Sequence, residues 1–128
     1  MVDFYKFTDY NSHITNNHSF FIMRKIEQQM NSAIRYRQNW AGSNTMVRVS
    51  REVVEVFLHG NHIASVDTAT NNLTLFDGGW QSNTTKSRLN ALLSEFIPSM
   101  RVNQKNWTWF LSDDLDGSTV PFISGMTV

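Results

Sequence analysis

The chain has 128 residues, no cysteine, and eleven basic against eleven acidic side chains, which gives a formal net charge of zero. This length fits one domain with its own core, and the balanced charge provides no whole-molecule attraction for nucleic acid or membrane. The missing cysteine excludes disulfides, thiol catalysis and cysteine-ligated metal, and no apolar run approaches the roughly 18 residues of a membrane span.

The N-terminal third predicts an arm followed by a helix. Residues 1–17 show no clear period and predict a loosely ordered arm, without the basic and apolar regions of a secretion signal. Residues 18–38 predict a helix, with Asn17 or Ser19 as its N-cap and Gly42 as its terminator. Its apolar side chains recur at three- and four-residue spacing and form one stripe: Phe20, Met23, Ile26, Met30, Ala33 and Ile34.

The middle of the chain predicts short antiparallel strands. Alternating or β-branched segments at 45–50, 53–59, 63–67 and 73–76 are separated by turn residues, as in a meander. Residues 83–97 predict a second helix that Pro98 ends. Segments 107–112 and 119–123 predict a closing hairpin, with Pro121 on an edge strand.

These elements predict one fold class. We expect an α+β domain over residues 18–128, with an antiparallel sheet of about five to six short strands and two helices on one face. The expected order along the chain is α-ββββ-α-ββ.

The segment GGWQSNTTKSRLNALL at 78–93 has two interpretations. In the structural one, Asn83, Thr84 and Thr85 cap the second helix, and Trp80 packs on its first turn as a hydrophobic staple. In the functional one, Lys86 and Arg88 concentrate positive charge at a helix start that is already positive, which an anion would relieve. The candidate anion or nucleotide contacts are Trp80, Thr84, Thr85, Lys86, Arg88 and Asn90.

A second candidate surface is the basic region between residues 24 and 51. Cations interleaved with aromatic side chains can follow a phosphate backbone and stack on bases, although a solvated helix face is the simpler interpretation. The candidate nucleic-acid contacts are Arg24, Lys25, Arg35, Arg37, Arg48, Arg51, Tyr36 and Trp40.

Other constellations carry less chemistry. His59 and His62 could share a metal with Asp67, but a turn explains them without one, so we expect no metal and no cofactor. The acidic turn that begins at Asp113 lacks the closing glutamate of a calcium loop. No nucleophile stands beside a base, so we expect no enzyme.

Four ordered motifs resemble a family of small accessory proteins of tailed bacteriophages. They are NTMV at 44–47, LHGNHIA at 58–64, the segment at 78–93, and the C-terminal W-x-W-F-L…F-I-S-G-M. The resemblance covers about residues 30–128 and implies an accessory role in the infected cell, with no catalytic residues assigned.

Three kinds of function stay open on this basis. We expect first a binding protein in the host cytoplasm that sequesters a host protein or a small anionic ligand, as host takeover or anti-defence. The alternatives are a nucleic-acid-binding protein that uses the basic first helix, and a virion or assembly component. The chain would act as a monomer, or as a homodimer through residues 20–37, where a near-heptad apolar run could form a short coiled coil.

Overall fold

The computed structural model describes residues 23–128, which form two helices and nine strands. Helix α2 spans Lys25–Arg35 and helix α3 spans Asn83–Phe96. Between them lie β1 (Trp40–Gly42), β2 (Thr45–Ser50), β3 (Val53–Leu58), β4 (Asn61–Asp67) and β5 (Asn72–Leu75). After α3 come β6 (Met100–Lys105), β7 (Thr108–Asp113), β8 (Ser118–Pro121) and β9 (Met126–Thr127). Neither helix of this part of the chain has the length and apolar character that a membrane crossing requires.

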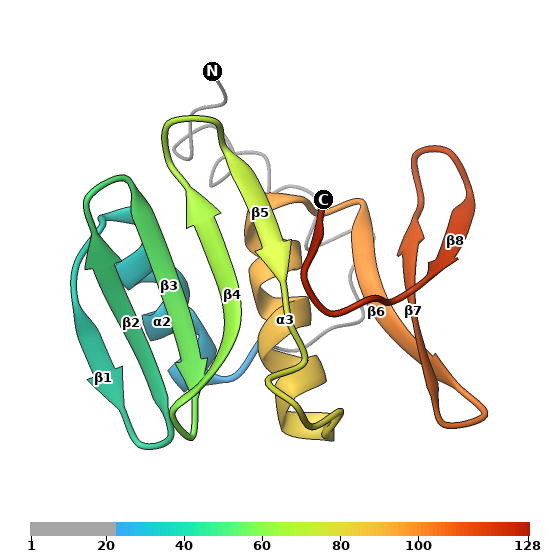
Figure 1. The fold of residues 1–128 in the computed structure, drawn as a ribbon, viewed down its shortest axis with the longest axis horizontal. Coiled ribbons are helices and arrows are strands. Elements are labelled where there is room, and N and C mark those ends of the chain that lie inside the picture. Colours follow the sequence, from blue (N-terminus) through green and yellow to red (C-terminus); the bar gives the residue numbers. More distant parts are fainter. Residues whose placement is uncertain (1–22) are drawn as a thin grey trace.

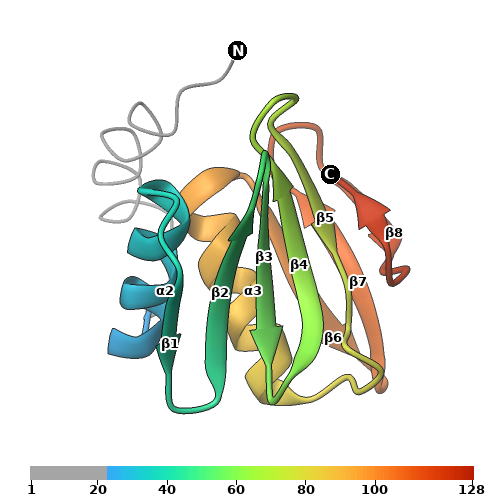
Figure 2. The same ribbon diagram turned by 60° about the vertical axis from the view of Figure 1, so that its left-hand side comes forward.

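The larger sheet has six antiparallel strands in the order β1-β2-β3-β4-β5-β9 (Figure 1). Its first five strands follow one another along the chain, and β9 returns from the C-terminus to pair with β5. Strand β3 shows why one face is covered, since Val54, Val56 and Leu58 are buried and alternate with more exposed residues. Figure 2 shows α2 and α3 side by side on that face.

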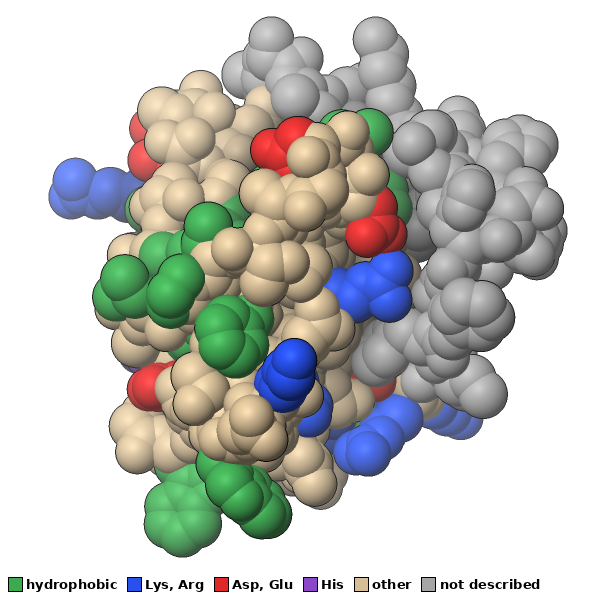
Figure 3. All heavy atoms as spheres, turned by 90° about the vertical axis from the view of Figure 1, so that its right-hand side faces the viewer, with side chains coloured by type: hydrophobic (Ala, Val, Ile, Leu, Met, Phe, Trp, Pro, Cys, Tyr) green, Lys and Arg blue, Asp and Glu red, His purple; other side chains and the backbone are tan. Residues whose placement is uncertain are grey.

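The smaller sheet consists of β6, β7 and β8 and lies on the far side of α3 from α2 (Figure 1). Val102, Trp109 and Leu111 are buried on its inner face. The Trp109 ring meets Phe122 edge-on, at 5.3 Å between centroids. The alternate residues of β6 and β7 form an outer face, which is seen from this side in Figure 3.

Both edges of the smaller sheet carry a feature that limits pairing with a further strand. The Asn90 side chain on α3 accepts from the Val102 N–H at 2.7 Å and donates to the Val102 carbonyl at 3.0 Å, as a neighbouring strand would. Directly after β8, the Phe122 N–H donates to the Trp109 carbonyl, so alternation directs the backbone of Pro121 outward. Proline has no N–H, which removes a donor from that edge.

These observations confirm the α+β class, and strands 45–50, 53–59, 63–67 and 73–76 were predicted nearly to the residue. The prediction missed β1, β6 and β9, and it placed all strands in one sheet where the structure has two. The predicted arm, the proposed caps Asn17 and Ser19, and residues 18–22 of the first helix lie outside the described residues.

The predicted end of the first helix was wrong. Helix α2 stops at Arg35 because Arg37 turns left-handed, with φ at 54°. The Arg37 and Gln38 N–H groups then bond back to the last turn, which satisfies its carbonyls. Gly42 lies instead in β1, where a Cβ would come within 2.5 Å of the Trp40 ring. That close approach explains the glycine better than helix termination does.

Candidate functional site

Arg88 lies at the centre of the predicted anion site, and it points into the protein. Its side chain is 3% exposed and pairs with Glu27 of α2, which is fully buried, at 2.8 Å. Its other nitrogens donate to the Thr45 hydroxyl at 3.0 Å and to the Asn44 side-chain oxygen at 3.1 Å. The guanidinium therefore joins α2, α3 and the start of β2, and it has no open side for an anion.

Glu27 is held from several directions. Besides Arg88, it accepts from the Ser87 hydroxyl at 2.6 Å and from the Arg24 N–H at 3.0 Å, at the start of α2. A buried carboxylate with a cation and two further donors is paired and hydrogen-bonded, as burial of charge requires. Sequence reasoning missed this residue, because Glu27 lies 61 positions from Arg88.

The other predicted contacts on α3 also have structural partners. Lys86 Nζ donates to Gln104 Oε1 on β6 at 3.2 Å, and Asn90 closes the edge of β6 as described above. Thr85 is buried, with its N–H bonded to the Ser82 hydroxyl at 3.1 Å. Ser82 is therefore the N-cap, and the prediction of Asn83, Thr84 or Thr85 in that role was wrong by one residue or more.

Trp80 does not act as a staple, because 74% of it is exposed. It forms one side of a pocket of about 370 Å³ beside the start of α3. The loop after β5, the first turn of α3 and the β3–β4 turn meet there. The lining residues are Leu58, His59, Asn61, Ile63, Asp77, Gly78, Trp80, Ser82, Thr84 and Thr85.

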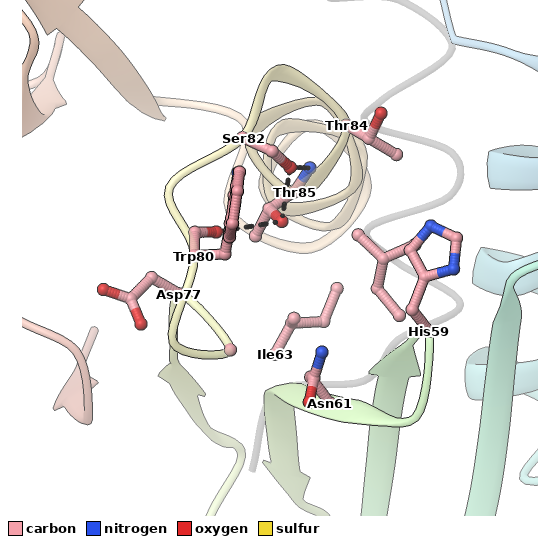
Figure 4. Close-up of a pocket in the computed structure, with 10 residues that line it drawn as sticks. His59, Asn61, Ile63, Asp77, Trp80, Ser82, Thr84 and Thr85 are labelled. Atoms are coloured by element: carbon pink, nitrogen blue, oxygen red, sulfur yellow. Dashed lines mark hydrogen bonds between the residues drawn. The ribbon is translucent and has the colours of Figure 1, made fainter.

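The pocket has apolar, aromatic and polar sides (Figure 4). Trp80 stands on one side and His59 on the opposite side, with Ile63 and Asn61 between them. Gly78 makes room for this arrangement. Its φ is +69°, and a Cβ there would come 3.2 Å from Asn61 and Ile63.

The two titratable side chains of the pocket are not arranged as an acid–base pair. The Asp77 carboxylate points away from the cavity in Figure 4 and accepts from the Gly79 N–H at 2.8 Å. His59 lies across the pocket on an exposed turn, with φ at 52°. The predicted cations Lys86 and Arg88 are not among the lining residues.

Sequence reasoning found Trp80, Thr84 and Thr85 of this pocket but did not connect them with His59 and Asn61. The Gly-Asn turn and the Gly78-Gly79 pair were the available signals. Both were interpreted as turns, because no sequence pattern showed that the two turns lie side by side.

The basic region does not form one free cationic surface. Arg35 pairs with Glu95 of α3. Arg37 donates to the Arg51 carbonyl at 3.0 Å, and Arg48 lies over the Phe57 ring. The remaining candidates divide by exposure: Arg24, Lys25, Arg51 and Tyr36 are exposed and Trp40 is partly buried.

The two histidines of the β3–β4 turn do not converge. His62 lies between the rings of Phe57 and Phe76, and its Nε2 is 2.7 Å from the Ser65 hydroxyl. Within residues 23–128, no group of three or more histidine, aspartate or glutamate side chains is placed to hold a metal.

The acidic turn between β7 and β8 bonds to its own backbone. The hydroxyl of Ser118, followed by its N–H, holds the pKa of the Asp116 carboxyl below its usual value. Asp113 likewise accepts from the Leu115 N–H at 3.0 Å. These are hydrogen bonds within the turn.

The predicted dimer seam is occupied within the chain. Met30, Ala33 and Ile34 are buried in the core of this same domain, where α2 contacts α3 and β2. A homodimer through residues 20–37 stays a prediction, and residues 20–22 of it lie outside the described part.

The fold and the pocket define a small α+β protein with a buried ionic link between its helices and an open pocket at one end of α3. A family model described as Kyanoviridae Gp96 protein matches residues 23–128, and the chain belongs to this bacteriophage family. The family assignment confirms the phage origin that the four motifs predicted. No curated protein and no solved structure matches the chain.

Proposed function

We propose that this phage protein acts by stoichiometric binding of a host component in the host cytoplasm, and not by catalysis. The pocket between Trp80 and His59 is the proposed binding site. The observation that carries the proposal is the exposure of Trp80. The side chain is 74% exposed, although it lies just before the N-cap of α3, where it could pack on the first turn of the helix. A large exposed aromatic side chain beside a cavity is typical of a recognition site.

The arrangement of the pocket favours binding over chemistry. A general acid or base must lie within hydrogen-bond reach of the group it serves. Asp77 is directed away from the cavity and already accepts a backbone hydrogen bond. His59 stands alone on the other side, without a carboxylate among the neighbours that Figure 4 draws near it.

The proposed ligand is a planar ring with hydrogen-bond acceptors, such as a nucleobase. Trp80 offers an indole face for stacking, and Asn61 offers an amide that can both donate and accept. Ser82 caps the Thr85 N–H, but the N–H groups before it at the start of α3 have no acceptor within the helix, and the helix dipole favours electron-rich atoms there. A phosphate has less support, because Arg88 is buried in its pair with Glu27 and Lys86 bonds to Gln104.

A thermal-shift screen with nucleosides, nucleotides and free bases tests the ligand class. A ligand at a hundred times its Kd should stabilise the protein by about 2.7 kcal/mol. Trp80→Ala should leave the unliganded melting temperature nearly unchanged, since the side chain is mostly exposed, and should remove the ligand-induced shift. Leu115→Ala is the matched control, because Leu115 is 83% exposed on the distant β7–β8 turn.

A pull-down from infected host cells tests the stoichiometric mode. We expect a host component that the Leu115→Ala protein retains and the Trp80→Ala protein loses. Equal capture by both variants would contradict the proposed site. Recovery of the protein in purified virions would favour the assembly role instead.

A further inference from the structure

The β6–β7 turn holds a tryptophan in an unfavourable backbone conformation. Asn106 and Trp107 have φ values of 51° and 66°, so both central residues of this tight turn are left-handed. Such turns favour glycine at the second position, and a bulky side chain there is uncommon. Trp107 is also 89% exposed, more than any other large hydrophobic side chain of the described residues.

Folding alone does not explain this residue. An exposed indole adds almost no burial, and glycine would fit the turn with less strain. Backbone strain and exposure therefore coincide at one side chain, and strain of this kind persists where a residue serves something other than folding.

The outer face of the smaller sheet continues from this turn. The register places Lys105 opposite Thr108, Asn103 opposite Phe110, and Arg101 opposite Ser112. Phe110 is half-buried on this face, Lys105 is exposed, and Asn103 donates to the Ser112 hydroxyl at 2.6 Å. Figure 3 shows hydrophobic side chains on this side of the molecule, with Lys or Arg side chains next to them.

We propose that the outer face of β6–β7–β8, with Trp107 at its end, binds single-stranded nucleic acid. Bases would stack on Trp107 and Phe110, and phosphates would contact Lys105 and Arg101. Single-strand sites combine aromatic platforms with cations along the backbone path, and every base has a face that can stack. Amide and hydroxyl groups between the rings supply sequence-tolerant hydrogen bonds.

The charge of this face favours nucleic acid over a basic protein partner at the Lys105 end, since the acids of this sheet lie at the opposite end, at the β7–β8 turn. The alternate positions of β6 and β7 that point outward include two cations and no acid. The nearest acidic partner is Asp114, whose carboxylate lies 2.9 Å from Arg101 in an exposed pair. That pair is weak in water, so a phosphate can replace Asp114 at the guanidinium.

This site differs from the basic first helix considered above and from the Trp80 pocket. It uses none of their residues, so either proposal can fail while the other holds.

The test is titration of the full chain with oligodeoxythymidylate and oligouridylate, followed by tryptophan fluorescence and by anisotropy of a labelled strand. We expect quenching on binding and a slope of log affinity against log salt of roughly −1.4 for two phosphate contacts. Lys105→Gln should reduce the slope by about 0.7. Asp114→Asn should strengthen binding, because Arg101 then has no competing carboxylate.

Trp107→Gly separates binding from folding. Glycine suits the left-handed position, so the variant should keep or raise the melting temperature. Its affinity for the strand should fall about 5- to 140-fold, which corresponds to the loss of one stacked base. Leu115→Ala should bind as the wild type does.

Three results would overturn the proposal. The first is no binding of either oligonucleotide at low salt, and the second is equal affinity of Trp107→Gly and wild type. The third is that no oligonucleotide binds, while the wild type binds a host protein or anionic vesicles and Trp107→Gly does not. That result would assign the face to the host protein or to the membrane.

Discussion

Replacement of Arg88 should lower the stability of the folded protein. If Arg88 belonged to a surface anion site instead, the same replacement would weaken only the binding of the anion. Arg88→Met keeps the apolar stem of the side chain and removes the charge. Glu27 then stays fully buried with the Ser87 hydroxyl and the Arg24 N–H as its donors and without its cation. Removal of one partner of a buried ion pair costs about 3–5 kcal/mol. The two remaining donors place our expectation at the lower end, about 3 kcal/mol.

Urea denaturation followed by tryptophan fluorescence measures this loss. A cost of about 3 kcal/mol corresponds to a fall in melting temperature of roughly 12 °C for a chain of this size. The slope of unfolding free energy against urea should not change, because the folded state buries nearly the same surface. Arg48→Met is the matched control. Arg48 is exposed and lies over Phe57 at 5.7 Å, so its loss should cost less than about 1 kcal/mol.

The double variant Glu27→Met with Arg88→Met tests the reason for the loss. If an unpaired buried charge is responsible, the double variant should cost at least about 1 kcal/mol less than the sum of the single variants. Strictly additive costs, or an Arg88→Met protein as stable as Arg48→Met, would refute the buried link between the helices.

The remaining predictions concern single side chains with one structural role each. Trp107→Gly should leave the free energy of unfolding unchanged or raise it by up to about 1 kcal/mol, because relief of left-handed strain exceeds the entropy that glycine adds to the unfolded chain; a less stable variant would contradict the strain. Ser82→Ala should lower it by about 1 kcal/mol through loss of the bond to the Thr85 N–H at 3.1 Å, whereas an unchanged urea midpoint would deny Ser82 the capping role. Asn90→Leu should cost about 1–3 kcal/mol and speed hydrogen exchange at the Val102 amide, which loses its acceptor; unchanged exchange would show that the edge does not depend on Asn90.

Local patterns in the sequence were sufficient for most elements of the larger sheet. Strand β3 alternates cleanly between buried and exposed residues, and its neighbours are bounded by turn residues, so their periods are visible without a structure. Strand β1 has three residues, which are too few to show a period. It also begins shortly after the polar end of α2, where the sequence showed no boundary between the two elements. In β6 only Val102 is buried, so the strand shows no alternating pattern. The Asn90 side chain that bonds to the backbone of Val102 lies on α3, distant in sequence.

The candidate site was less predictable because it depends on contacts distant in sequence. A cation near the start of a helix is visible at Arg88, but its partner Glu27 belongs to another helix. The ion pair with Glu27 shows that Arg88, predicted as a ligand contact, has a structural role. Aromatic side chains are usually buried, but Trp80 and Trp107 are exposed. The sequence alone does not show which of its four tryptophans are exposed.

The two edges of the smaller sheet affect how the protein behaves when it is abundant. An open strand edge is a template on which further copies can add and build fibrils. Here the Asn90 amide occupies one border of β6–β8, and Pro121 withholds a donor from the other. Strand addition at these two borders is therefore disfavoured when copies are crowded, even though Trp107 and Leu115 expose hydrophobic surface nearby.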